Sequence, residues 1–381
     1  MSGEAVLDLA TLPTPALVLD AACMRRNIAR MRNRLGALGV GFRPHVKTCK
    51  SIEVARELMP HGQGPITVST LREVEQFFAH GVDDILYAVG IAPGKLDAVS
   101  DLRRRGCNLA VILDSVEAAE AVAAHGAQSR TTIPVLIEID TDGHRAGVPP
   151  ESGELPAIAA ALHGGAMLRG VMTHAGASYE CRSEAALVAM AEQERAGAVR
   201  AAERLRAAGF AVPVVSVGST PTALCARHLE GVTEVRAGVF VFFDLVMAGI
   251  GVCGVDDIAL SVLATVIGHR RDKGLLLTDA GWMAMSRDRG TARQPVDQGY
   301  GLVLDRDGAR VPGLWMSDAN QEHGLIAARD GGAIDFARFP LGSRLRVLPN
   351  HACATAAQHA AYHVVEEGRR ELAVWERFGG W

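Results

Sequence analysis

Several reactive residues occur where apolar, strand-like runs end. Lys47 closes RPHVKTCK, Arg145 follows IPVLIEID, and His174 closes LRGVMTH. The segment VGSTPT at 217–222 then supplies small residues and hydroxyl groups. If these runs are parallel strands of one closed sheet, their carboxyl ends lie at a single rim. An amine, a guanidinium, an imidazole and an anion-binding turn would then converge there.

The amine of Lys47 suits covalent chemistry with an aldehyde. The residue ends an otherwise apolar segment, and partial desolvation there favours the neutral amine that a Schiff base requires. The same position also fits an ordinary lysine at a strand end whose head reaches solvent. Taken alone, the residue leaves both interpretations open.

The turn at 217–222 is a candidate phosphate site. Gly218, Ser219 and Thr220 precede Pro221 at the start of an expected helix, so backbone N–H groups and hydroxyls can face an anion. Gly238, near the next strand, allows a further close backbone approach. A capped turn explains the same residue types without any ligand. Across the rim from a lysine, however, a phosphate cradle is what pyridoxal 5′-phosphate (PLP) requires, and we expect that cofactor.

His351 and Cys353 form a second candidate site. In a locally extended chain, residues two apart project to the same face, so an imidazole and a thiolate would meet one metal ion. This donor pair favours Zn²⁺ over Mg²⁺ or Mn²⁺. Two protein ligands would leave other positions for water and substrate. By spacing alone, an incidental pair fits better.

The elements that must position these residues predict an α/β fold. From residue 39 to about 245, eight apolar runs alternate with helical segments, as in a parallel sheet covered by helices. A (β/α)8 barrel fits better than an open doubly wound sheet, because no glycine-rich turn follows the first strand. The expected strands are 40–47, 66–70, 84–89, 108–114, 133–140, 168–174, 213–218 and 233–243. The expected helices are 49–60, 71–80, 94–105, 115–125, 150–163, 182–209 and 221–230.

The pattern changes after residue 250, where strand-like pieces follow one another without long helices. This is typical of a β-rich domain. Its expected strands are 259–269, 274–281, 301–304, 323–328 and 344–349, to which PALVLD (15–20) is expected to pair. We therefore predict a PLP-binding barrel over 12–248 and a β-rich domain over 249–381 that carries the metal site and is joined by residues 1–20.

Composition restricts the class of protein. The chain has 381 residues, 49% of them hydrophobic, with 39 basic against 43 acidic side chains, which argues against a nucleic-acid partner. No apolar run approaches the ~18 residues of a membrane span, and MSGEAVLDLATLPTP lacks the features of a secretory signal. Seven irregularly spaced cysteines do not form a disulfide framework. We expect a cytoplasmic enzyme that acts on a small molecule.

Six motifs together resemble one family. They are TPALVLD (14–20), RPHVKTCK (43–50), IDTDGHRAGV (139–148), VGSTPT (217–222), RAGVFVFFD (236–244) and PNHACAT (349–355). Their types and order resemble the alanine racemase-type (fold type III) PLP enzymes, in the branch of D-serine dehydratases and D-threonine aldolases. The resemblance implies a PLP-binding barrel followed by a β domain, and a homodimer.

The resemblance also implies roles for particular residues. Lys47 would carry PLP, Arg145 would reach the phenolic oxygen of the cofactor, and His174 would lie beside its ring. Tyr179 is a further candidate for contact with the ring or the substrate. One departure is Cys49, which stands where many relatives have histidine.

The C-terminal motif separates two activities within this branch. Aldolases typically carry His-Cys-Asp, whereas dehydratases carry His-x-Cys and use zinc. The tripeptide His351-Ala352-Cys353 follows the dehydratase pattern. The expected enzyme therefore eliminates water from D-3-hydroxy amino acids: Lys47 abstracts the Cα proton, and zinc stabilises the departing hydroxyl.

The preferred substrate stays open at this point. D-threo-3-hydroxyaspartate would give oxaloacetate and ammonia, and D-serine would give pyruvate; the alternative activity is a metal-dependent aldolase acting on the same class of substrate. A second substrate carboxylate would require a cation, and the candidates are Arg43, Arg145, Arg236, Arg287 and Arg293.

Overall fold

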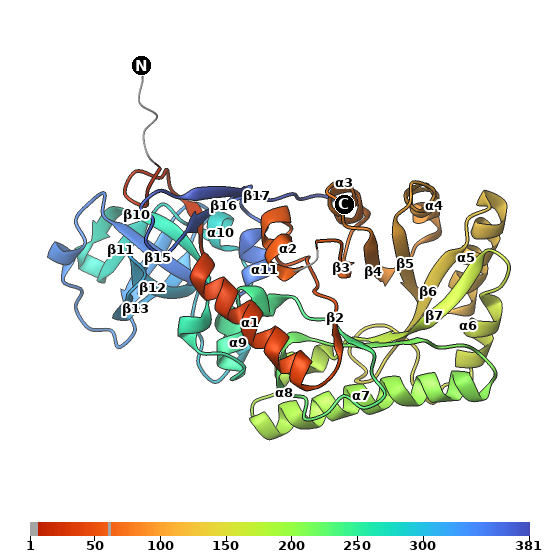
Figure 1. Cartoon of the computed structure of the whole chain (residues 1–381). Helices are drawn as coiled ribbons and strands as arrows, with labels where there is room; N and C mark the ends of the chain where they lie inside the picture. Colours follow the sequence, from red (N-terminus) through yellow and green to blue (C-terminus); the bar gives the residue numbers. More distant parts are fainter. Residues whose placement is uncertain (1–6, 60–61) are drawn as a thin grey trace, which may run out of the picture. The chain divides into compact units, whose positions relative to one another are not determined.

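The computed structural model describes residues 7–59 and 62–381 (Figure 1). The chain divides into two compact units, one formed by Ala29–Gly238 with Phe378–Trp381 and the other by the chain up to Ile28 with Val239–Arg377. The first residues of the segment predicted at 1–20, and the last residue of the helix predicted at 49–60, lie outside the described part. Within that part, no helix combines the length and apolarity needed to cross a bilayer.

The first unit is built on a parallel sheet of eight strands in the order β2-β9-β8-β7-β6-β5-β4-β3. A bridge between His45 and Thr67 joins the two ends of this order, with hydrogen bonds of 2.9 Å from Val46 N to Thr67 O and from Thr67 N to Pro44 O. The predicted (β/α)8 barrel is thus confirmed. Its strands are β2 (Gly41–Phe42), β3 (Ile66–Val68), β4 (Asp84–Gly90), β5 (Asn108–Leu113), β6 (Ile133–Ile139), β7 (Ala166–Thr173), β8 (Val214–Val217) and β9 (Glu234–Val235).

Helices cover the outer face of these strands (Figure 1). Thr70, Ser115 and Ser183 each cap a following helix by accepting a hydrogen bond from the backbone N–H three residues on. The helices are α2 (Ile52–Leu58), α3 (Leu71–Ala79), α4 (Leu96–Arg104), α5 (Val116–Ser129), α6 (Leu155–Ala161), α7 (Glu184–Ala207) and α8 (Thr220–Cys225). They fall where the periodicity predicts them. Helix α1 (Ala21–Ala37) is an element that the sequence analysis did not predict.

The two strands that meet at the closure are much shorter than predicted. The predictions for 40–47 and 233–243 correspond to strands of two residues each, and Val239–Val241 is a 3₁₀ helix instead. Backbone hydrogen bonds nevertheless continue past the short strands, from Arg43 N to Val235 O at 2.9 Å and from His45 N to Ala237 O at 2.8 Å. At Gly238 the two segments lie so close that a Cβ there would be 2.8 Å from the carbonyl oxygen of His45.

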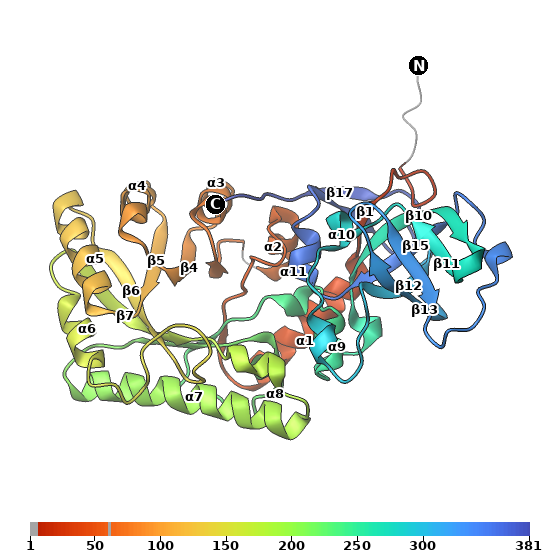
Figure 2. The ribbon, with the colours of Figure 1, turned by 180° about the vertical axis from the view of Figure 1, so that it is seen from behind.

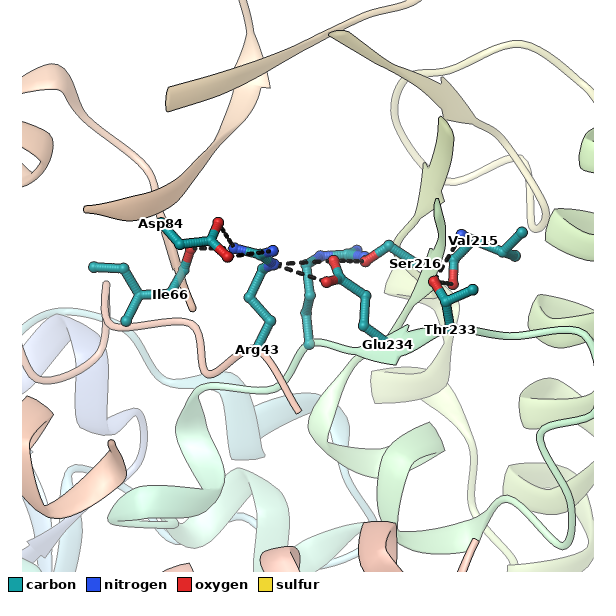
Figure 3. Close-up of polar contacts among 8 residues, drawn as sticks. Arg43, Ile66, Asp84, Val215, Ser216, Thr233 and Glu234 are labelled. Atoms are coloured by element: carbon teal, nitrogen blue, oxygen red, sulfur yellow. Dashed lines mark hydrogen bonds and ion pairs between the residues drawn. The ribbon is translucent and has the colours of Figure 1, made fainter. Parts of the chain in front are cut away.

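The interior of the barrel holds an apolar cluster, in which Leu86, Ile112, Leu136 and Met172 from four successive strands are buried together. Charged side chains adjoin this cluster: Arg43 Nε lies 2.9 Å from Glu234 on β9, and Arg43 Nη1 lies 2.9 Å from Asp84 on β4 (Figure 3). One guanidinium therefore links strands on both sides of the closure.

Arg236 is the second internal guanidinium. It is 3% exposed, and it donates hydrogen bonds to Ser216 Oγ at 2.6 Å and to the carbonyl oxygen of Thr173. Burial lowers the pKa of Arg236. Arg43 and Arg236 were candidates for binding a second substrate carboxylate, and the structure shows that both are engaged inside the barrel instead.

The second unit contains a nine-stranded sheet in the order β11-β14-β13-β12-β15-β10-β1-β16-β17 (Figure 2). Strand β10 also pairs with β11, so the strands from β11 to β10 close into an antiparallel barrel. The segment 15–20 is β1, which pairs antiparallel with β10 and parallel with β16. The strands are β1 (Ala16–Asp20), β10 (Leu260–Arg270), β11 (Leu275–Thr278), β12 (Gly301–Asp305), β13 (Arg310–Ala319), β14 (Gly324–Ala328), β15 (Arg344–Pro349), β16 (Ala361–Val365) and β17 (Ala373–Glu376).

Three short helices interrupt this β-rich unit, namely α9 (Leu245–Gly249), α10 (Trp282–Met285) and α11 (Ala352–Ala356). The predicted β-rich character is confirmed, whereas β13, β16 and β17 were not predicted. The sequence of β13 explains why it was missed. Its buried residues are Val311, Leu314 and Met316, but Pro312 and Gly313 follow the first of them, and a Pro-Gly pair indicates a turn.

We expect Met172→Ala to destabilise the barrel by about 2–4 kcal/mol, because it leaves a cavity in the apolar cluster. Met167 lies on the same strand, β7, but is 45% exposed, so Met167→Ala is the matched control and should change stability by no more than about 0.5 kcal/mol. Urea unfolding followed by circular dichroism measures both. Equal effects of the two substitutions would contradict this description of the interior.

Candidate functional site

Lys47 lies just beyond the point where the barrel closes. The chain leaves the sheet at His45, and residues 46–49 form a turn, so Lys47 is exposed rather than partly desolvated as its apolar context predicted. The neighbouring amine differs: Lys50 Nζ lies 3.2 Å from Glu73 Oε1, and Glu73 is 1% exposed. Lys47 forms no ion pair with any residue in the described ranges. Of the two amines in this motif, Lys47 is therefore the one available to react.

His174 follows the last residue of β7 and faces the same rim. Its Nδ1 lies 3.0 Å from the carbonyl oxygen of Gly218, so Nδ1 donates and Nε2 carries a free lone pair. Burial lowers the pKa of His174 to about 3, and the positive charges of Lys47 and Arg145 act in the same direction. His174 is thus neutral near pH 7. Because the charges of Lys47 and Arg145 act on His174, the barrel brings these three predicted residues close together.

His45 is a rim residue that the sequence analysis missed. It lies between Arg43 and Lys47 at two-residue spacing, the alternation that puts side chains on one face of a strand. Burial holds the pKa of His45 well below its ordinary value, assisted by the charge of Lys47. A second neutral imidazole therefore stands next to the reactive amine, and the alternating pattern was the signal that could have identified it.

The predicted phosphate turn is closely packed. Gly218 has φ +138°, and a Cβ there would lie 2.0 Å from the carbonyl oxygen of Arg236. Ser219 caps α8 together with Thr222 in a reciprocal capping box, and its Oγ lies 2.9 Å from Ser178 Oγ. The hydroxyls of Ser219 and Thr222 thus hold the turn itself together.

Thr220 is the first residue of α8 and directly follows that cap. Gly238 approaches the same end of the barrel, since a Cβ on it would lie 2.8 Å from His45 O and 3.1 Å from Thr48 Oγ1. At Gly218 and Gly238 the chain therefore packs directly against backbone of Arg236 and His45, and any other residue would place its Cβ against those atoms.

Glu194 on α7 holds two rim loops in place and was also missed. Its Oε1 accepts hydrogen bonds from the backbone N–H of Ala175 at 3.0 Å and of Gly218 at 2.9 Å. The residue is 2% exposed, and burial raises its pKa although these hydrogen bonds oppose the rise. One carboxylate therefore fixes the loop that carries His174 relative to the turn at Gly218.

Arg145 lies in the loop that follows β6. Its Nη2 is 3.4 Å from Glu138 Oε1, and its side chain is 59% exposed whereas that of Glu138 is 7% exposed. Burial raises the pKa of Glu138, and Arg145 counteracts this. Because most of its guanidinium faces outward, Arg145 retains donors for a further anionic group.

Tyr179 belongs to a 3₁₀ helix (Gly176–Glu180) that follows β7 and His174. Its ring centroid lies 6.3 Å from that of His174, at an interplanar angle of 51°. Tyr179 is therefore close to the predicted rim residues, on the side of His174.

The second candidate pair, His351 and Cys353, belongs to the β-rich unit. His351 is extended, with φ −134° and ψ 107°, but it is the N-cap of α11, and Cys353 lies in the first turn of that helix. The prediction of a locally extended chain was therefore wrong beyond His351. The two side chains nevertheless meet, because a hydrogen bond joins the imidazole to the thiol. A helix start brings them together where an extended segment was expected.

Two carboxylates surround this pair. Asp288 Oδ2 lies 2.6 Å from His351 Nδ1, and Asp244, 1% exposed, accepts a hydrogen bond from the backbone N–H of Ala352 at 2.9 Å. Burial lowers the pKa of His351, but Cys353, Asp288 and Asp244 outweigh it and raise that pKa to about 11. This strongly negative environment is suited to a cation.

The donor set fits a metal with open positions. An imidazole nitrogen and a thiolate are typical zinc ligands. Among residues 7–59 and 62–381, no group of three or more His, Cys, Asp and Glu side chains is arranged around one ion position. His351 and Cys353 would thus supply two ligands and leave the remaining positions to water or substrate.

Comparison with known proteins gives a consistent result. The family description "Alanine racemase, N-terminal domain" matches residues 19–246, and "Putative serine dehydratase domain" matches residues 259–365. The chain is 60% identical over 377 residues to the D-threo-3-hydroxyaspartate dehydratase of Delftia sp. (strain HT23), which covers 98% of this chain and 99% of that protein. It is 30% identical to the D-serine dehydratase of Dictyostelium discoideum, over 94% of each chain.

Solved structures agree with these similarities. The structure of the D-threo-3-hydroxyaspartate dehydratase from Delftia sp. HT23 superposes on this chain with a TM-score of 0.96, and the match covers 98% of this chain and 100% of that one. A C353A mutant of D-threo-3-hydroxyaspartate dehydratase was solved "in the metal-free form". The 3-hydroxy-D-aspartate aldolase of Paracoccus denitrificans is less similar, at 27% identity over 97% of this chain and 92% of that protein.

We expect Glu194→Ala to destabilise the barrel by about 2–4 kcal/mol, because it leaves two buried backbone N–H groups without an acceptor. Glu194→Gln keeps an acceptor oxygen at the same position, so this variant should lose much less stability than Glu194→Ala. Glu203, exposed on the same helix, provides the control Glu203→Ala, which should have little effect. Urea unfolding compares the three variants, and an equal loss for Ala at 194 and at 203 would refute the role of Glu194.

Proposed function

The chain belongs to the alanine racemase-type family, and from this premise we propose that it is a PLP- and zinc-dependent dehydratase of D-3-hydroxy amino acids. We propose D-threo-3-hydroxyaspartate as the preferred substrate, converted to oxaloacetate and ammonia, with D-serine as a second substrate that gives pyruvate. The observation that carries the proposal is the pairing of His351 with Cys353, in a chain 60% identical to a dehydratase of that substrate.

The residues of the barrel rim fit PLP. Lys47 would hold the cofactor covalently, Arg145 would donate to its phenolic oxygen, and the backbone at Gly218, Ser219, Thr220 and Gly238 would hold its phosphate. When bound, PLP withdraws electrons from the Cα of an attached amino acid. The support in the structure is the turn at Gly218 and Ser219, which leads into the start of α8 at Thr220, and the outward-facing donors of Arg145.

The proton steps would then fall to residues of the chain. Lys47 would take the Cα proton on Nζ, which forms no ion pair with a carboxylate among residues 7–59 and 62–381. His174 would remain neutral, since its pKa is lowered to about 3, and would present Nε2 as an acceptor towards the ring. Tyr179 would border the same space beside His174.

The metal would be held by His351 and Cys353. When bound, Zn²⁺ acts as a Lewis acid that stabilises negative charge on the departing β-hydroxyl. The two protein ligands would leave room for that hydroxyl, and the N-cap geometry of His351 would keep the imidazole and thiol on one side of the helix start. A metal-dependent aldolase would use the same pair, but it is less favoured because the aldolase relative is less similar.

The structure reduces the number of cations available for a second substrate carboxylate. Arg43 and Arg236 are engaged inside the barrel, so Arg145, Arg287 and Arg293 remain as candidates. We further propose a cytoplasmic homodimer: the homodimer follows the family resemblance, and the location is supported by seven cysteines of the described residues that form no disulfide.

We expect Lys47→Arg to abolish covalent PLP binding, because a guanidinium does not form the linkage at neutral pH. The matched control is Lys50→Arg, which keeps the positive charge beside Glu73 and should bind PLP as the wild type does. The measurement is borohydride reduction of the PLP-loaded protein followed by mass mapping of the modified peptide. Labelling of Lys50 in the wild type, or loss of labelling in Lys50→Arg, would contradict the assignment.

We expect Cys353→Ala to abolish elimination while the covalent PLP content stays unchanged, since it removes a metal ligand and leaves the barrel intact. The reaction is followed with both D-3-hydroxyaspartate diastereomers, D-serine and D-threonine, by measuring ammonia and 2-oxo acid separately from glycine and aldehyde. Glycine as the main product of the wild type would establish the aldolase alternative. Unchanged turnover by the variant would remove zinc from the mechanism.

A further inference from the structure

We propose that Asp288 is the positioning residue of the metal site: its carboxylate accepts the Nδ1 proton of His351 and thereby presents Nε2 to the ion. The inference rests on the proposed function insofar as His351 is a metal ligand. It adds a third side chain that does not itself bind the ion but determines how well the pair binds it. No sequence motif pointed to this residue.

The distance between the two side chains supports this role. Asp288 Oδ2 and His351 Nδ1 are 2.6 Å apart, which is the short range of a charge-assisted hydrogen bond. A neutral imidazole has one protonated nitrogen and one lone pair. When an ion binds, Nδ1 keeps its proton in the hydrogen bond to Asp288 and the proton on Nε2 is displaced, so Nε2 is the nitrogen that remains for a ligand. A carboxylate behind a ligating imidazole also raises its basicity and fixes its ring plane.

The turn that carries Asp288 is held in an unusual conformation. Ser286 has φ +74°, a region that non-glycine residues rarely occupy, and Ser286 Oγ accepts a hydrogen bond from Asp288 N at 3.0 Å. Thr355 Oγ1, on α11, donates to the carbonyl oxygen of Met285 at 2.7 Å. The turn is therefore attached to the same helix that begins at His351, so the carboxylate and the imidazole keep their relative positions.

A different carboxylate holds the backbone of the pair. Asp244 accepts hydrogen bonds at 2.9 Å from the N–H of Ala352 and from the N–H of Met247. It therefore joins the start of α11 to the start of α9 through backbone N–H groups. The division of roles is clear in the structure: Asp244 places the helix start, whereas Asp288 orients the ring.

An ordinary half-exposed ion pair is the competing explanation, since the side chains of His351 and Asp288 are 40% and 42% exposed. Such a pair contributes little to stability and would not influence an ion on the other ring nitrogen. The two explanations differ in metal affinity and not in folding. A measurement of metal affinity therefore separates them.

The experiment measures the affinity of the metal-free protein for Zn²⁺ by competition with a chromogenic chelator, without substrate. We expect Asp288→Ala to weaken Zn²⁺ binding about 10–100-fold, with unchanged circular dichroism. Asp288→Asn should fall between the wild type and Ala, because its amide oxygen still accepts from Nδ1. The control is Asp272→Ala, which removes an exposed acid of the same unit that pairs with Arg270 and should leave the affinity unchanged.

Two reference variants separate this inference from the proposed function. If His351→Ala and Cys353→Ala lose Zn²⁺ but Asp288→Ala and Asp288→Asn bind it as the wild type does, Asp288 has no positioning role and the proposed metal site stands. If His351→Ala binds Zn²⁺ as well as the wild type, the proposed metal site itself is wrong, and the role of Asp288 is overturned with it.

Discussion

The barrel depends on the guanidinium of Arg43, because its closure is made where regular strand pairing is weakest. Strands β2 and β9 have two residues each and so contribute few ladder hydrogen bonds. Arg43 compensates by joining Glu234 on β9 to Asp84 on β4 at 2.9 Å each. Removing one partner of such a pair leaves an uncompensated charge, which is strongly destabilising. The same segment then reaches Lys47, so the position of this amine follows from the closure.

Carboxylates hold both candidate sites together in the same way. Glu194 accepts from backbone groups of two rim loops, Asp244 accepts from the helix start that carries Cys353, and Asp288 accepts from an imidazole. In each case one side chain connects segments that are distant along the chain. Hydrogen bonds to ionised groups are stronger than neutral ones, which suits them to fixing groups at a site built from loops.

The sequence predicted the barrel well where periodicity was strong and poorly where it was interrupted. The run 133–140 became a strand with every residue of β6 buried, whereas 233–243 became a strand of two residues followed by a 3₁₀ helix at Val239–Val241. The rim residues were found because strand ends are visible in sequence. Their roles towards a cofactor, and the domain boundaries at 12–248 and 249–381, remain predictions.

The sequence by itself determined the architecture and the reactive groups: the alternation of apolar runs and helices, the amine at Lys47, and the imidazole and thiol at His351 and Cys353. Only the tertiary structure decided which carboxylates hydrogen-bond to the segments that carry these groups. It also decided that Arg43 and Arg236 are engaged inside the barrel. The reason is physical. Periodicity and strand ends are local properties of the chain, whereas Glu194 and Asp288 act through hydrogen bonds between segments whose separation in sequence carries no signal until the chain folds.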